Sequence, residues 1–184
     1  MSTRANIKIM EGDKVTWLYH HHDGYPTYLG AFLMWRLYNK LNNPNCYLDT
    51  CDIVNGLIKD KVDDEFEYTS EMHGDIEYLY VIDVDKRTLR CFEMDFVADP
   101  NDKFNYDLKV GNEVDLKTSI SEYNPARTTI DNKEVWYLSD RMGNSYLDKN
   151  HCTAYFDSKE QAQVRAFEHV FEAFDAKYKD KGEQ

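Results

Sequence analysis

The sequence has few of the residues that stabilise small secreted proteins or that cross membranes. Only 4 cysteines and 4 prolines occur among its 184 residues, so it lacks the cysteine density of a disulfide scaffold. The longest apolar run, Leu29 to Leu37, is interrupted by Gly30 and Arg36 and is too short to span a bilayer. The start, Met1 to Asn6, lacks the apolar stretch of a secretory signal. These absences predict a cytoplasmic protein without membrane segments.

The familiar signatures of enzymes are also absent. The chain contains no P-loop, no dinucleotide-binding glycine fingerprint, no Gly-x-Ser-x-Gly elbow and no His-Glu-x-x-His helix. We therefore expect no cofactor, and the sequence leaves open whether the protein is an enzyme.

What the chain has is a high aromatic content combined with strong negative charge. Hydrophobic residues make up 42% and aromatic residues 14%, which is enough to build a buried core. Its 34 acidic and 22 basic residues give a net charge of −12, which opposes direct binding to nucleic acid and to anionic membranes. The stretch from Asp60 to Asp107 holds fifteen acidic and five basic residues. We expect this stretch to form one strongly negative surface region.

Hydrophobic patterning predicts a hairpin and two helices in the first sixty residues. Ala5 to Met10 and Val15 to Tyr19 flank a polar turn, the pattern of two short paired strands. Apolar residues at helical spacing from Leu29 to Leu41 predict a helix. A second, shorter helix is expected to begin with Thr50 as its N-cap. Its predicted inward-facing side chains are Ile53, Val54, Leu57 and Ile58.

The middle of the chain has the pattern of strands. Ile76 to Val84 is apolar on both faces and predicts a central strand, with Thr88 to Met94 as its antiparallel partner. A second hairpin is expected to turn at Gly111-Asn112. We predict short strands at 134–138 and 152–156, and loops at 95–107 and 121–133.

The last segment predicts a long helix that begins with a capping box, Ser158 to Gln161. Its predicted buried stripe consists of Phe167, Val170, Phe171, Phe174 and Tyr178. Together these elements predict an α+β fold in a single domain, residues 1–184. A mainly antiparallel sheet would begin with the N-terminal hairpin and would be packed by the helix after an Asp-Gly-Tyr-Pro turn and by the long C-terminal helix.

Two groups of residues have the composition of metal ligands. In a strand, His20 and His22 would share one face and His21 the other, so at most two of these histidines could bind one metal ion. The carboxylates Asp83, Asp85, Glu93 and Asp95 could converge on magnesium across a hairpin. We favour partly exposed histidines and solvated carboxylates, and predict no metal site.

The segment Asp23-Gly24-Tyr25-Pro26 predicts a turn from strand to helix. Gly24 can adopt positive φ, and Pro26 suits the first turn of a helix. A functional alternative is that His22, Asp23 and Tyr25 surround an anionic ligand at the helix N-terminus.

The start, Ser2 to Ile7, and the later His22 to Pro26 resemble a family of small uncharacterised proteins of bacteriophages, prophages and bacteria. Those proteins begin Ser-Thr-Arg-x-Asn-Ile and carry an aromatic residue or histidine before Asp-Gly-Tyr-Pro. Glu77 to Asp83 also resembles their tyrosine-rich strand. The resemblance covers the first forty residues and the central hairpin, and it implies a mobile-element setting in a host cytoplasm. The positions that match, and that we take as candidate ligand-binding residues, are Arg4, Asn6, His22, Asp23 and Tyr25.

Two functions follow from these observations. The first is a phage or mobile-element accessory protein that binds a basic host or defence protein, as an acidic mimic of nucleic acid. Its candidate partner-binding residues are Asp63, Asp64, Glu65 and Glu67. The second is a module, or an enzyme, that binds an anionic small molecule or nucleotide at the turn from His22 to Pro26. The sequence does not fix the oligomeric state.

Overall fold

A computed structural model describes residues 3–59, 66–99, 102–148 and 150–179. The chain divides into two compact units, Met1–Leu116 and Lys117–Gln184, and each is described by itself.

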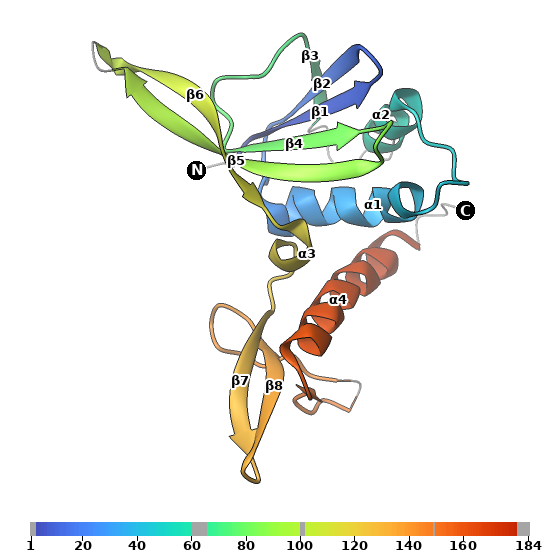
Figure 1. The fold of residues 1–184 in the computed structure, drawn as a ribbon, viewed down its shortest axis with the longest axis vertical. Helices are drawn as coiled ribbons and strands as arrows, with labels where there is room; N and C mark the ends of the chain where they lie inside the picture. Colours follow the sequence, from blue (N-terminus) through green and yellow to red (C-terminus); the bar gives the residue numbers. More distant parts are fainter. Residues whose placement is uncertain (1–2, 60–65, 100–101, 149, 180–184) are drawn as a thin grey trace. The chain divides into compact units, whose positions relative to one another are not determined.

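The first unit contains a six-stranded sheet with two helices packed against it (Figure 1). The strand order is β3-β2-β1-β4-β5-β6; β1 and β4 are parallel, and all other neighbours are antiparallel. The strands are β1 (Ala5–Glu11), β2 (Lys14–His20), β3 (Phe66–Thr69), β4 (Tyr78–Asp83), β5 (Thr88–Asp99) and β6 (Asp102–Val114). The helical segments are a π-helical turn, η1 (Pro26–Gly30), which continues into α1 (Ala31–Asn42), and α2 (Thr50–Lys59).

Alternation along the two central strands gives the sheet two buried faces. Ile7 in β1 lies beside Tyr80 in β4, and both are fully buried. Gly30, at the start of α1, packs on the Tyr80 ring, so α1 lies on this face. Leu79, the residue before Tyr80 in β4, points to the opposite face. There it joins a second cluster of buried residues with Tyr19, Ile76 and Met94. The apolar pattern on both faces of β4 predicted its central position, and this prediction is confirmed.

The predicted hairpin at Gly111-Asn112 is wrong. β6 runs through both residues, and its pairing with β5 extends from Cys91–Val114 to Asp99–Asp102. The predicted loop 95–107 is therefore strand wherever the structure describes it. Gly111 has a different role, since a Cβ atom there would lie 2.8 Å from the Asp95 carboxylate. The glycine lets this carboxylate lie close to the strand, beside the irregularity between Phe92 and Met94.

The N-cap of α2 also differs from the prediction. The Asp49 side chain, not that of Thr50, accepts the amide hydrogen bond of Asp52, at 2.6 Å. The predicted inward side chains Ile53, Val54 and Leu57 are buried, whereas Ile58 is 37% exposed.

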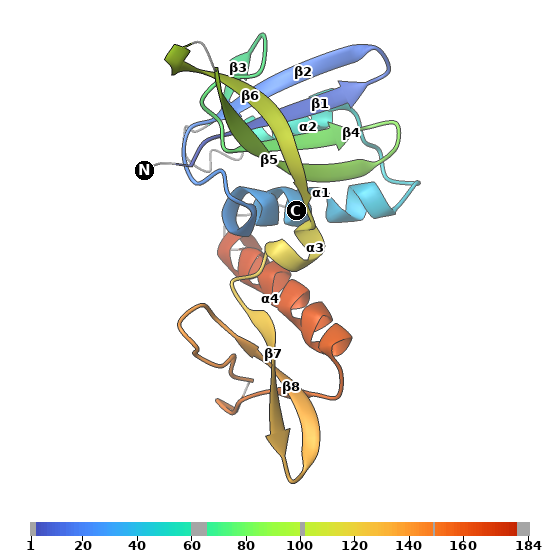
Figure 2. The same cartoon turned by 60° about the vertical axis from the view of Figure 1, so that its left-hand side comes forward.

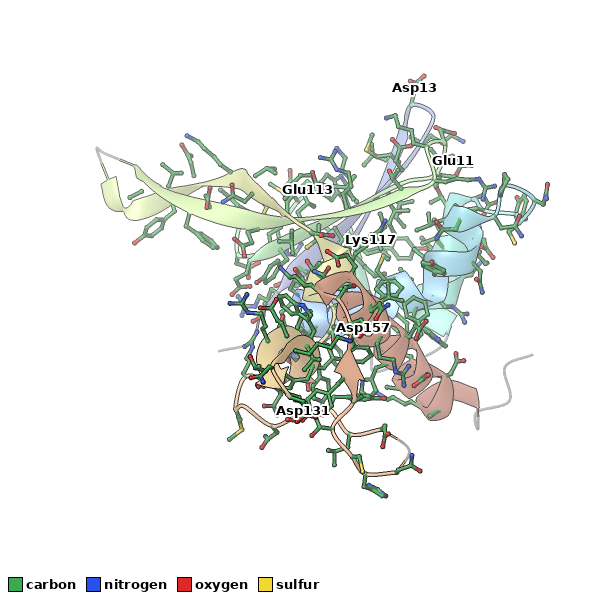
Figure 3. All side chains as sticks on the ribbon, turned by 60° about the horizontal axis from the view of Figure 1, so that its bottom comes forward. Glu11, Asp13, Glu113, Lys117, Asp131 and Asp157 are labelled. Carbon is green, nitrogen blue, oxygen red and sulfur yellow. The ribbon has the colours of Figure 1, made fainter. Side chains whose placement is uncertain are left out.

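The second unit is a three-stranded antiparallel sheet packed by the long helix α4 (Figure 2). Its elements are α3 (Leu116–Ser119), which begins at the boundary, β7 (Asn124–Ile130), β8 (Lys133–Ser139), β9 (Tyr155–Phe156) and α4 (Lys159–Lys179). The predicted strand at 134–138 is confirmed, whereas the predicted loop 121–133 contains β7. The β7–β8 turn is made by Asp131 and Asn132, both at positive φ, and Figure 3 labels Asp131.

The start of α4 confirms the serine half of the predicted capping box, while the Gln161 side chain bonds the amide one residue before the N-cap. Ser158 Oγ accepts from Gln161 N at 3.2 Å, and Gln161 Oε1 accepts from Asp157 N at 3.1 Å. The buried face of the helix differs in part from the prediction. Ala162 and Ala166 pack on Leu138. Val170 and Tyr178 are buried, and the three phenylalanines of the predicted stripe are half-buried.

The predicted α+β class, with a mainly antiparallel sheet, an N-terminal hairpin and a long C-terminal helix, is confirmed. The described residues form two sheets, however, and α4 packs against the smaller one. Among the helices in the described part of the chain, none has the length and apolar character needed to cross a membrane.

Candidate functional site

Arg4 lies immediately before β1 and is held by two carboxylates. Its Nη1 atom forms an ion pair with Asp75 Oδ2 at 2.6 Å, and its backbone amide donates to Glu77 Oε2 at 2.6 Å. The carbonyl oxygen of Arg4 accepts from the Glu77 amide, at 3.0 Å, which fixes the start of β4 beside the start of β1. Both charged groups of the ion pair are about half exposed.

Asn6 has a structural role inside the sheet. It is fully buried, and its Nδ2 donates to the Leu18 carbonyl at 2.9 Å. Its Oδ1 accepts from the His73 amide at 2.8 Å. The side chain therefore joins β1 to β2 and anchors the segment that leads into β4.

The Asp-Gly-Tyr-Pro segment forms a turn that packs against β1. The positive φ, 52°, belongs to Asp23 and not to Gly24 as predicted. A Cβ atom at Gly24 would lie 2.8 Å from the Ala5 Cβ, so glycine is required for close packing. The Gly24 amide donates to the Thr3 carbonyl at 2.8 Å. The Gly24 carbonyl accepts from the buried Tyr80 hydroxyl at 2.9 Å. Pro26 begins the helical segment as predicted.

The turn places the remaining candidates near Arg4, because Gly24 is hydrogen-bonded to Thr3, the residue before Arg4. His22, Asp23 and Tyr25 are exposed. Four of the five candidate ligand-binding residues therefore lie on the surface at the end of the sheet where β1 begins, and Asn6 lies inside.

Three aromatic side chains at this end of the sheet were not predicted as site residues. The rings of Tyr19 and His73 are stacked, with centroids 4.0 Å apart, and the His21 ring meets Tyr19 edge-on. The Tyr19 hydroxyl donates to the Asp75 carboxylate at 3.2 Å. Burial, with the negative charge of Asp75, raises the pKa of Tyr19. The tyrosine therefore stays a neutral donor that orients the same carboxylate as Arg4.

The three consecutive histidines have separate environments. His20 is buried, its ring lies 4.6 Å from that of Phe66, and burial lowers its pKa to about 4. His21 Nε2 lies 3.0 Å from Glu67 Oε2 on β3. His22 is exposed beyond the end of β2. Over the described residues, no three side chains of metal-ligand type are grouped closely enough to hold a metal ion.

The acidic residues of the middle of the chain lie at several places. Four of them lie at the end of the sheet where β1 begins: Glu67, Asp75, Glu77 and Glu93. Glu67 pairs with Tyr19 near the end of β2. Glu93 pairs with Tyr78, which itself pairs with Ala5, the first residue of β1. We call these four carboxylates the acidic sheet end. Of the candidate partner-binding residues, Asp63, Asp64 and Glu65 lie outside the described residues.

Asp83 and Asp85 do not approach Glu93. Asp83 is the last residue of β4 and pairs with Thr88, whereas Glu93 pairs with the first residue of β4. The alternative in which these four carboxylates converge across a hairpin is therefore ruled out. Asp83 bonds Lys86, whose ammonium holds the pKa of the Asp83 carboxyl below its ordinary value. Asp85 accepts from the Gly12 amide at 2.7 Å. Glu11 and Asp13 lie at this opposite end of the sheet (Figure 3).

A pocket of about 190 Å³ lies between α1 and α2. Its charged lining residues include Lys40 and Asp52, which form an ion pair with each other. The pocket contains none of the candidate residues from the sequence.

Comparisons with protein-family models, curated proteins and solved structures find no match for this chain.

Proposed function

We propose that the protein acts by binding, and that the acidic sheet end takes up a basic segment of a partner protein. The observation that carries this proposal is the arrangement of Arg4 on Asp75 and Glu77. Asp75 already binds one guanidinium of the chain itself, and Glu77 binds the backbone amide of the same arginine. Glu67 and Glu93 add two exposed negative charges at the same end, one on each face of the sheet. Carboxylates in such a group attract guanidinium and ammonium groups.

Asp75, the carboxylate that binds Arg4, is held in place by buried groups. Tyr19 orients Asp75, while Asn6 anchors the backbone at His73, two residues before it. A site that is ordered before binding loses little entropy when the partner arrives. This favours a docking role over simple solubility.

The family resemblance supports a mobile-element setting, in which the partner is a host or defence protein with a basic nucleic-acid-binding groove. A net charge of −12 supports the same idea, since it attracts such a groove over long range. The second candidate, an anionic ligand near Arg4, stays a prediction. Asp75 and Glu77 offset the positive charge of Arg4, so the local field favours a cationic group.

The test uses a fluorescent arginine- and lysine-rich peptide as a probe. We expect saturable binding that weakens as salt is raised. Replacing Glu67→Gln, Glu77→Gln and Glu93→Gln together should weaken binding by about tenfold or more, from the loss of three charges. Fluorescence anisotropy measures the affinity, and thermal unfolding checks that the variant is folded.

The matched control neutralises three carboxylates elsewhere: Asp13→Asn at the other end of the sheet, and Asp131→Asn and Asp157→Asn in the second unit (Figure 3). It should bind as the unmodified protein does. Equal losses in both triple variants would show that only net charge matters, and no binding at low salt would refute the proposal.

A further inference from the structure

The strand β6 forms one edge of the larger sheet (Figure 2). Over the described residues, β5 is the only strand paired with it. β6 is 13 residues long, contains no proline and is therefore able to pair along its outer edge. Such an edge presents a row of backbone amide and carbonyl groups to any further strand.

Several exposed side chains on β6 and on its neighbour β5 are apolar, which is unusual for a solvent-exposed edge. Tyr106 and Val110 on β6 are 56% and 53% exposed, and Phe96 on β5 is 48% exposed. Phe96 pairs with Leu108, so these four side chains lie on the same face of the sheet. An exposed apolar strip beside an open edge is a typical site for pairing with another strand.

The sequence of β6 is complementary to itself. If two copies of the strand pair antiparallel about Leu108, Asp107 of each copy lies opposite Lys109 of the other, on one face. On the other face Tyr106 lies opposite Val110, an aromatic and β-branched pair. Leu108 is the midpoint of the strand, so this register uses its whole length.

Neighbouring registers lack this complementarity. The two strands would be related by a two-fold axis perpendicular to the sheet, and residues paired across them must point to the same face. The axis must therefore lie between one residue and the same residue of the other copy, so each possible register is centred on a single residue. A centre one residue earlier or later places Asp107 or Lys109 opposite its own copy. Like charges that face each other across strands are destabilising.

We propose that the occupant of this edge is a second copy of the chain. Two β6 strands pair antiparallel about Leu108 and join the two larger sheets into one. The contact is isologous, so one charge pair and one apolar pair each occur twice. This assembly does not depend on the proposed binding of a basic partner.

The test is a pair of charge reversals measured by analytical ultracentrifugation. Unmodified protein should sediment as a dimer. Asp107→Lys makes the centre of both strands basic, and Lys109→Glu makes it acidic, so each variant alone should dissociate at least tenfold more readily. The double variant, D107K with K109E, restores opposite charges and should dimerise again. An equimolar mixture of the two single variants should form a heterodimer.

The mixture also guards against misfolding, because only folded hairpins can form the heterodimer. A second control, Lys14→Glu at the β1–β2 turn, reverses a charge on another strand and should leave the dimer intact. An unmodified protein that stays monomeric at all concentrations would overturn the proposal. A dimer that is indifferent to both single reversals would place the interface elsewhere and would overturn it equally.

Discussion

At the scale of residues, the two N-terminal segments on which the family resemblance rests contact each other. Gly24 from the Asp-Gly-Tyr-Pro segment is hydrogen-bonded to Thr3, and its Cα packs on Ala5 from the Ser-Thr-Arg segment. The Tyr80 hydroxyl, from the tyrosine-rich strand, holds the Gly24 carbonyl. A structural reason therefore exists for these segments to occur together: the turn docks on the first strand only if its second residue lacks a side chain.

We predict that Gly24→Ala destabilises the protein by about 1–3 kcal/mol, the usual cost of overpacking a close contact. The added methyl group would lie 2.8 Å from Ala5 Cβ and 2.9 Å from the Arg4 carbonyl carbon, which is backbone. Urea unfolding measures the difference. The control is Gly74→Ala, where nothing lies within 4 Å of the added atom, and its stability should change little. Equal stabilities for the two variants would contradict this account of the turn.

The residues of the site could be predicted only in part. The sequence pointed to Arg4 and to the exposed turn residues, and the structure brings them to one end of the sheet. It also pointed to Asn6, but the sequence alone does not distinguish an asparagine that bonds the buried backbone from one that binds a ligand. Tyr19 and His73 were not predicted, because their stacking joins positions far apart in the chain and no local pattern reports it.

At the scale of elements, local signals predicted the helices but failed for the long pair of strands β5 and β6. The capping box of α4 and the apolar spacing of α1 are short-range features, so both helices were placed near their true ends. In β6, the Gly111-Asn112 pair is a strong turn signal, but it forms an irregularity in the strand, and β6 pairs with β5 on both sides of it. Cross-strand contacts outweighed the local preference. The strand β7 was predicted as a loop. The turn that follows it, Asp131-Asn132, lacks the glycine of the commonest hairpin turn, so the sequence contains no clear hairpin signal there.

The C-terminal end of α1 depends on Arg87, which lies in the β4–β5 turn. Its guanidinium donates to the carbonyl oxygens of Lys40 and Asn43 through Nη1, and to that of Cys46 through Nη2 at 2.8 Å. These carbonyls lie at or beyond the last turn of the helix, where helical partners are missing. One side chain therefore satisfies groups that would otherwise require water.

We predict that Arg87→Ala costs about 2 kcal/mol of stability, from the loss of several charge-assisted hydrogen bonds. Arg87 has a φ of 53°, and alanine keeps the backbone strain that arginine already has there. The matched variant Arg87→Gly removes the same side chain and relaxes that φ. Urea unfolding should show both variants to be destabilised, with glycine the milder. An alanine variant as stable as the unmodified protein would show that the carbonyl contacts contribute nothing.

At the scale of the whole molecule, each of the two compact units has its own sheet and its own buried cluster. In the first unit, Tyr19, Ile76, Leu79 and Met94 form a cluster on one face of the larger sheet. In the second, Leu138 packs on Ala162 and Ala166. Both buried partners on α4 are alanines, so Leu138 is the largest fully buried side chain of that cluster, and partly buried aromatic side chains pack around it. The sequence predicted a single domain, and the cooperativity of unfolding tests that prediction directly.

We predict that Leu138→Ala destabilises the second unit by about 2–5 kcal/mol, from the lost apolar contacts and the cavity left in the middle of its buried cluster. Amide hydrogen exchange in the unmodified and variant proteins reports each unit separately. Exchange should accelerate in β8 and α4, while the amides of β1 and β4 keep their protection. The reciprocal variant Leu79→Ala should accelerate exchange in β1 and β4 first. Equal acceleration throughout the chain in both variants would mean that the two clusters unfold together, as a single cooperative domain does.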